Sequence, residues 1–152
     1  MSIDTDAAAL RKIPLFRGIE DQKLRLLAFM SERVRFDEGE NLVEEGDFGD
    51  VAYIILSGTA DVLVGSPSGE QLVATVQEND FVGEIALLID VPRTATVRAT
   101  SEIVALAVNK EHFFKLLGNF PDMALEVMRA LAHRLERTTR DFGRLRASVS
   151  NT

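Results

Sequence analysis

The middle of the chain has a different hydrophobic period from its two ends, and this change limits the folds that the chain can adopt. Between Glu32 and Val108, apolar and polar residues alternate as they do in half-buried strands. Turn-forming glycines divide this segment into short runs. We expect strands near 32–37, 40–44, 51–57, 60–65, 70–76, 94–100 and 102–108. Many short strands between helical ends predict an α+β fold around a jelly-roll β-roll or a small β-barrel.

Helical spacing is found on both sides of this segment. A short helix ends before Pro14, and residues 20–30 form a second helix. After the strands we expect a helix over 110–118, closed by a left-handed cap at Gly118. Pro121 then opens a long helix, since proline is favoured at the first helical position.

The length and composition indicate one folded domain. A chain of 152 residues, of which 46% are hydrophobic and 27% charged, can bury a single core. We expect one domain over 1–152, with N-terminal helices over 1–31, a β-roll over 32–108 and C-terminal helices over 109–146.

Charge and cysteine content disfavour several classes of protein. With no cysteine, the chain has neither disulfides nor thiolate chemistry, and we expect a cytosolic location. A net charge of -7 disfavours a general nucleic-acid binder, because phosphate contacts need clustered basic residues. The apolar runs are too short for a membrane span, and no targeting leader is recognisable.

The segment over 83–99, GEIALLIDVPRTATVRA, interrupts the strands with one helical turn of small and aliphatic residues. Gly83 allows a close backbone approach, and a helix over 84–89 would offer free N–H groups to an anion. Arg93 follows a proline and carries a guanidinium, the group that best grips a phosphate through two hydrogen bonds. Glu84 would repel a phosphate, so its carboxylate is better suited to ribose hydroxyls. Phosphate and ribose in one compact site imply a nucleotide.

This segment resembles the phosphate-binding cassette of the cyclic nucleotide-binding domain family. The cassette spans 83–97, and its pattern is matched by Gly-Glu-Ile-Ala-Leu-Leu over 83–88 and by Pro-Arg-Thr-Ala-Thr-Val over 92–97. The spacing of nine positions from Glu84 to Arg93 equals that of kinase regulatory subunits. The resemblance implies a β-roll with an inserted cassette helix, flanked by N-terminal helices and a long C-terminal helix.

The resemblance also implies which residues bind the ligand. Glu84 would bind the ribose 2′-hydroxyl, Arg93 the cyclic phosphate, and the backbone of Ile85 and Ala86 would complete the phosphate cradle. The implied ligand-binding set is Val73, Gly83, Glu84, Ile85, Ala86, Arg93, Thr94, Thr138 and Thr139. No catalytic residue, metal ion or further cofactor is implied. Two alternatives stay open: Glu84 and Arg93 form a structural ion pair, or the fold has lost its ligand.

Thr94 bears on the choice of base. In the family's cGMP-dependent kinases a threonine at this position reaches the guanine amino group, whereas bacterial cAMP binders often carry serine or threonine here as well. A threonine is also a good strand residue. We favour cAMP and keep cGMP as the second candidate ligand.

The long helix carries an apolar seam at alternating spacings of four and three. Its members are Ala124, Met128, Leu131, Leu135, Thr138, Phe142 and Leu145. The seam predicts a homodimer through a parallel coiled coil over 121–145, and the alternative is packing on the protein's own β-roll. The helix resembles the dimer helix of the catabolite activator branch of the family, where the pair matching Thr138 and Thr139 contacts the adenine base.

The expected mechanism is a shift of populations. Ligand would draw the cassette helix inward, and the helices after Val108 would re-pack to cover the base. We expect no helix-turn-helix DNA-binding module after Leu145. We therefore expect a sensor that signals through an unknown protein partner, or the regulatory piece of a longer chain.

Enzymatic alternatives lack the residues that they need. A cupin-type metal site requires histidines on strands, and His112 and His133 fall in expected helices. The glycine-lysine motif of a P-loop hydrolase is absent. An interaction module that acts through its coiled coil is the remaining alternative.

Overall fold

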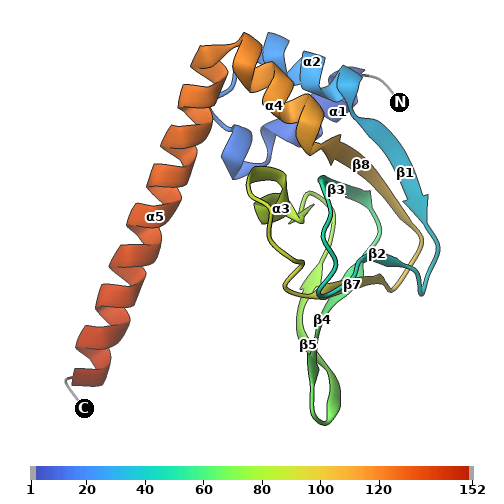
Figure 1. The fold of residues 1–152 in the computed structure, drawn as a ribbon, viewed down its shortest axis with the longest axis vertical. Helices are drawn as coiled ribbons and strands as arrows, with labels where there is room; N and C mark the ends of the chain where they lie inside the picture. Colours follow the sequence, from blue (N-terminus) through green and yellow to red (C-terminus); the bar gives the residue numbers. More distant parts are fainter. Residues whose placement is uncertain (1–2, 151–152) are drawn as a thin grey trace.

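A computed structural model describes residues 3–150 of the chain. In this part, eight strands form two antiparallel four-stranded sheets, ordered β1-β8-β3-β6 and β2-β7-β4-β5 (Figure 1). The strands are β1 (Glu32–Phe36), β2 (Asn41–Val43), β3 (Val51–Ser57), β4 (Ala60–Ser66), β5 (Gly69–Val76), β6 (Phe81–Val82), β7 (Thr96–Ala99) and β8 (Ile103–Asn109). Side chains from both sheets bury one another, so the two sheets are the halves of a β-roll.

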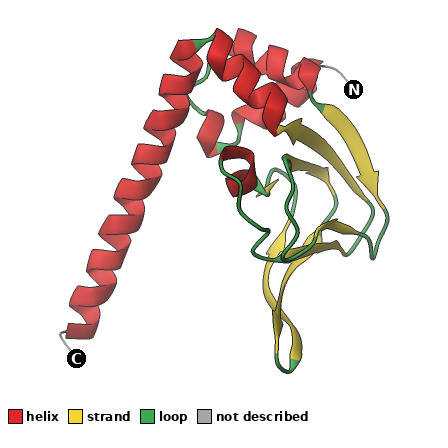
Figure 2. Ribbon diagram, in the orientation of Figure 1, coloured by secondary structure: helices red, strands yellow, loops and turns green. Residues whose placement is uncertain are grey.

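Helices lie at both ends of the chain and at one interruption of the roll. They are α1 (Ile3–Arg11), the 3-10 helix η1 (Pro14–Phe16), α2 (Asp21–Met30), α3 (Glu84–Leu88), α4 (Lys110–Asn119) and α5 (Pro121–Ser150). The helices α1, α2 and α4 gather at one end of the roll, and α5 extends away from them past α3 (Figures 1 and 2). Within residues 3–150, no helix is long and apolar enough to cross a membrane.

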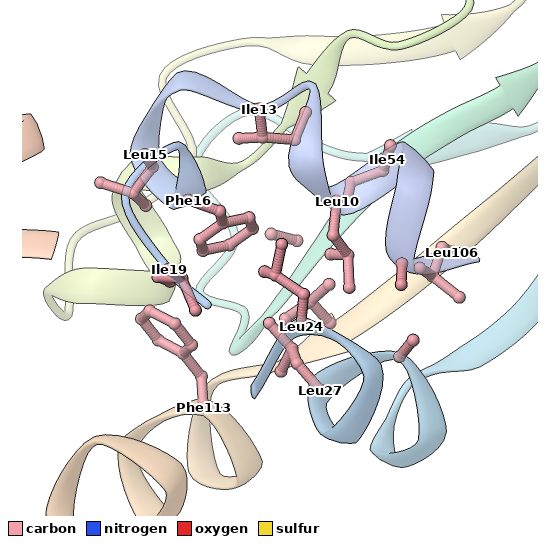
Figure 3. Packing of buried hydrophobic residues seen from close by; sticks show 14 of the residues in the cluster. Leu10, Ile13, Leu15, Phe16, Ile19, Leu24, Leu27, Ile54, Leu106 and Phe113 are labelled. Atoms are coloured by element: carbon pink, nitrogen blue, oxygen red, sulfur yellow. The ribbon is translucent and has the colours of Figure 1, made fainter. Parts of the chain in front are cut away.

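Two groups of buried side chains hold these elements together. The larger group joins the terminal helices to β3 and β8. At its centre the rings of Phe16 and Phe113 lie 5.6 Å apart (Figure 3). The ring of Phe81 lies at the same distance from Phe16. The smaller group fills the space between the sheets, where Ile55 and Ile103 are fully buried. The larger group therefore ties the first helices of the chain to the last ones.

The helix α3 interrupts the roll between β6 and β7, at a place that depends on one glycine. Gly83 precedes α3 with φ 82°, a left-handed conformation that is unfavourable for residues with a side chain. The helix buries Ala86 and Leu87 against the core and leaves Ile85 exposed. This arrangement fixes Glu84 as the first residue of α3, at the edge of the roll.

Within residues 3–150, the apolar contacts of α5 with the core come from its first three turns. Met123 and Val127 are buried in the larger core group, and Leu131 contacts it from the side. Further along, Leu135 is 68% exposed and Phe142 is 59% exposed. The residues that α5 buries, Met123 and Val127, therefore lie beside the apolar seam, while Met128, Leu135, Phe142 and Leu145 of the seam are each more than half exposed.

The structure confirms the α+β fold and most of the expected elements. Strand ends differ from the expected ones by one or two residues, and the cassette helix lies where the sequence predicts it. Sequence reasoning missed η1 and β6, because elements of two or three residues are too short to show a period.

The expected left-handed cap at Gly118 is wrong. The helix α4 continues to Asn119, and Gly118 is absent from the described glycines that have a positive φ. The turn is instead closed by the N–H of Phe120, which donates to the carbonyl oxygen of Leu116 at 2.9 Å. The long helix also runs beyond residue 146, to Ser150.

Candidate functional site

A hollow of about 230 Å³ lies between β6, α3 and the segment that leads to β7. Six of the nine residues that the sequence assigns to a ligand site line it: Gly83, Glu84, Ile85, Ala86, Arg93 and Thr94. The short helix and the strand entry fold back on each other, which brings residues nine positions apart to one small cavity. The cassette therefore forms one continuous site.

The guanidinium of Arg93 lies between two glycines. Its Nη2 donates a hydrogen bond to the carbonyl oxygen of Val51 at 2.7 Å, and the residue is only 9% exposed. A Cβ atom at Gly83 would clash with Nη1, and a Cβ atom at Gly49 would clash with Nη2. The two glycines therefore provide the space that the guanidinium occupies.

The backbone of Arg93 is also fixed. Its N–H donates to the carbonyl oxygen of Asp47 at 2.8 Å, and its own carbonyl oxygen accepts from the N–H of Gly46 at 2.9 Å. Both partners belong to the loop between β2 and β3. Because main chain and side chain are both held, the direction of the guanidinium is set before any ligand arrives.

One nitrogen of this guanidinium has no acceptor. Nη1 of Arg93 is buried and makes no hydrogen bond to any residue that the structure describes. Burial lowers the pKa of Arg93, while the charges of Tyr53 and Asp50 act in the opposite direction. A buried donor without an acceptor costs roughly 1–3 kcal/mol. Since Nη1 is the nitrogen next to Gly83, which lines the hollow, an anion in the hollow would supply the missing acceptor.

Glu84 is held by a different element. Its two carboxylate oxygens accept hydrogen bonds from the two terminal nitrogens of Arg134 on α5, with 3.1 Å between Nη2 and Oε2. The hydrogen bond to Glu84 raises the pKa of Arg134. The carboxylate is 20% exposed and the guanidinium 38%, so solvent partly screens the pair. This contact links the cassette helix α3 directly to α5.

The sequence analysis did not predict Arg134. It lies four residues, or about one helical turn, before Thr138 and on the same face of α5, which is the signal that could have pointed to it. The open alternative of an ion pair between Glu84 and Arg93 is not what the structure shows, because each side chain has a different partner.

Three of the expected ligand-binding residues lie away from the hollow. Val73 is on β5 and is 58% exposed. Thr138 and Thr139 are exposed on the part of α5 beyond Arg134. None of the three lines the hollow, so within one described chain they do not join the cassette residues.

The two histidines lie in helices, as the sequence predicted. His112 is in α4, and His133 is in α5. Among the described residues, no group of three or more His, Asp or Glu side chains is placed to hold a metal ion.

Residues 33–120 match the family described as Cyclic nucleotide-binding domain, and the chain belongs to this family. It is 36% identical over 114 residues to a cAMP-dependent protein kinase regulatory subunit of Mucor circinelloides f. lusitanicus. It is 28% identical over 137 residues to a CRP-like cAMP-activated global transcriptional regulator of Mycobacterium tuberculosis. The names of these relatives agree with the prediction that the domain is regulatory and not an enzyme.

Solved structures show the same fold. The N-terminal domain of a transcriptional regulator from Streptomyces coelicolor A3(2) is 34% identical, with a TM-score of 0.81 over 86% of this chain and 94% of that one. The Thermus thermophilus Catabolite Activator Protein is 25% identical, with a TM-score of 0.71 over 88% of this chain and 63% of that one.

The matched relatives are longer than this chain. The match to the Mucor subunit covers 75% of this chain and 27% of that protein, and the match to the Mycobacterium regulator covers 90% and 61%. The similarity therefore concerns the cyclic nucleotide-binding part of those proteins.

Proposed function

We propose that the hollow binds a cyclic mononucleotide, with cAMP as its first ligand. The observation that carries this proposal is the buried Nη1 of Arg93, which borders the hollow and has no acceptor among the described residues. An oxygen of a cyclic phosphate would accept from it in a short, charge-assisted hydrogen bond. Two of the relatives are named for cAMP, which favours this ligand.

The neighbouring groups complete a nucleotide site. The backbone N–H groups of Ile85 and Ala86 lie in the first turn of α3, where helical N–H groups lack partners within the helix. They would share the phosphate with Arg93. Glu84 would accept from the ribose 2′-hydroxyl, since a carboxylate has about four acceptor positions and Arg134 uses two.

The choice of base rests on Thr94. Its side chain lines the hollow directly after Arg93 and is exposed, so its hydroxyl is available to a bound base. We propose cAMP as the preferred ligand and cGMP as a second one. If Thr94 contacts guanine, Thr94→Ala weakens cGMP binding by roughly 1–2 kcal/mol and spares cAMP. Equal effects on both nucleotides would mean that Thr94 does not distinguish the bases and has only a structural role before β7.

We propose that Arg134 couples the site to α5. A nucleotide that fixes Glu84 also fixes the partner of Glu84, and this partner lies on α5. Binding then changes the packing of the helices after Val108, because the ligand prefers one of two helix positions. Arg134 is a positioning residue in this scheme, since it acts on the ligand through Glu84.

We further propose a homodimer through residues 121–145. The uncovered seam residues Met128, Leu135, Phe142 and Leu145 are each more than half exposed on one helix. A second copy would cover them. The same arrangement would allow Thr138 and Thr139 of one copy to reach the base in the other, and Val73 to border the covered ligand. The N-terminal helices over 1–31, the β-roll over 32–108 and the C-terminal helices over 109–146 would respond together to ligand binding. All three contribute side chains to the larger core.

Calorimetric titration with cAMP and cGMP tests the site. We expect Arg93→Leu to weaken binding by roughly 2–4 kcal/mol, because it removes a charge-assisted contact from a partly dry cavity. Arg93→Lys should restore only part of the loss, since an ammonium lacks the planar fork.

The matched control is Arg35→Leu. Arg35 is exposed on β1 and pairs with Glu102 far from the hollow, so its loss removes the same charge without touching the site. Unchanged affinity in a folded Arg93→Leu variant would overturn the assignment. No binding of either nucleotide by the wild-type chain would favour the interaction module.

A further inference from the structure

A basic groove of about 460 Å³ separates η1 and the turn after it from the middle of α5. The ionic residues that line it are Arg17, Arg129, Arg137, Arg140, Glu126 and Glu136. Four guanidinium groups against two carboxylates give a local charge of +2, in a chain whose net charge is -7. The groove therefore has the opposite sign to the chain as a whole.

The arginines of the groove are not equally compensated. Arg129 pairs with Glu126, and Arg140 pairs with Glu136 at 3.2 Å. Arg17 and Arg137 have no carboxylate within ion-pair distance among the described residues. Both are exposed, Arg17 after η1 and Arg137 on α5, so they belong to opposite walls of one groove. Two like charges on facing walls repel unless an anion lies between them.

The groove lies on the opposite side of α5 from the apolar seam. His133 lines the groove, and Leu135, two residues further on, belongs to the seam. Two residues correspond to about 200° around a helix. A second copy bound along the seam would therefore leave the groove open to another partner.

We propose that this groove binds an acidic segment of a partner protein, whose carboxylates bridge Arg17 and Arg137. A carboxylate matches the guanidinium fork with two parallel hydrogen bonds. This surface is separate from the nucleotide hollow and shares no lining residue with it. It would give the domain an output that does not depend on its own seam.

The chemistry of the groove favours a peptide over a nucleic acid. Glu126 and Glu136 lie among its arginines, and they would repel the closely spaced phosphates of a nucleic acid. The same carboxylates can accept hydrogen bonds from the backbone N–H groups of a peptide. The net charge of -7 also repels an extended polyanion beyond the groove.

Fluorescence anisotropy with a labelled hexaglutamate peptide tests the proposal on the full chain, at about 0.15 M salt. We expect Arg17→Ala/Arg137→Ala to bind the peptide about tenfold more weakly than the wild type, because both uncompensated guanidinium groups are lost. Arg17→Lys/Arg137→Lys should lie between the two. Both residues are exposed, so the variants should fold, and circular dichroism checks that they do.

The matched control is Arg144→Ala/Arg146→Ala, which removes the same number of charges from exposed positions of α5 that do not line the groove. The proposal requires this control to bind within about twofold of the wild type, since neither Arg144 nor Arg146 lines the groove. Equal losses in both double variants would show diffuse attraction and overturn it. A duplex DNA that binds more tightly than the peptide, or no peptide binding by the wild type, would overturn it as well.

Discussion

The two parts of α5 have the same kind of sequence but different surroundings. Met123 and Val127 are 3% and 4% exposed and belong to the core, whereas Leu135 and Phe142 stand in solvent on the same helix. Arg134 lies at the border, where its guanidinium reaches Glu84 of the cassette. The first part of the helix therefore packs one face on the domain, and the apolar residues of the second part are exposed within the described chain.

This difference separates folding from assembly. A helix stripe that is covered within the chain contributes to the free energy of unfolding. A stripe that is uncovered contributes only when a partner covers it. Arg134 stands between the two parts, so changes there should affect ligand binding more than either stability or assembly.

The largest expected effect is on stability, at the covered part of α5. We expect Val127→Asp to lower the free energy of unfolding by about 3–5 kcal/mol, because it places an unpaired charge in the larger core. Urea denaturation at low protein concentration measures this change. Leu135→Asp is the control, and it should change the stability of the monomer by less than about 0.5 kcal/mol. Equal losses would show that the second part of the helix is also covered within one chain.

The next effect is on assembly, at the uncovered part. We expect Leu135→Glu to weaken a homodimer by several kcal/mol, because it places two like charges face to face in an apolar seam. Sedimentation equilibrium measures the change. Leu135 is a better site for this test than Leu131, which contacts the core of its own chain.

His133→Glu serves as the control for assembly, because it adds the same charge on the opposite side of the helix. It should leave the dimer within about 0.5 kcal/mol of the wild type. If the wild-type chain stays monomeric at high micromolar concentration, the proposed homodimer is wrong.

A smaller effect is expected at the border between the two parts. Arg134→Ala should weaken cAMP binding by about 1–2 kcal/mol, because Glu84 loses the group that orients it. Stability should change by less than about 1 kcal/mol, since the ion pair is partly exposed. Arg134→Lys should recover part of the affinity. Calorimetric titration of the wild type and the two variants with cAMP measures these affinities. Equal affinities in all three would contradict the coupling role of Arg134.

The smallest effect concerns the threonines of the uncovered part. If a second copy brings Thr138 to the base, Thr138→Ala should weaken cAMP binding by about 0.5–1 kcal/mol through one lost hydrogen bond. The same substitution should have no effect in a Leu135→Glu background, where the dimer is split. Calorimetry of the single and double variants measures the difference. An equal effect in both backgrounds would mean that each chain covers its own ligand.

Much of the fold follows from local patterns. The strand over 51–57 and the helix that opens at Pro121 are both found where their periods predict them, because period and turn residues act over a few positions. The cap at Gly118 was not found, since the helix α4 reaches Asn119 before Phe120 closes it. The preference of glycine for a left-handed cap did not decide this helix end, where α4 and α5 both pack on the larger core.

The sequence alone predicted that Gly83, Glu84 and Arg93 belong to one site, and the three residues line one hollow, because their spacing along the chain is local. Only the tertiary structure showed that Glu84 pairs with Arg134, fifty positions away, since no pattern in the chain specifies a contact over that distance. It also decided that α5 buries Met123 and Val127 and leaves Met128 and Leu135 exposed, because the apolar pattern of a helix does not record which of its residues the rest of the chain can reach.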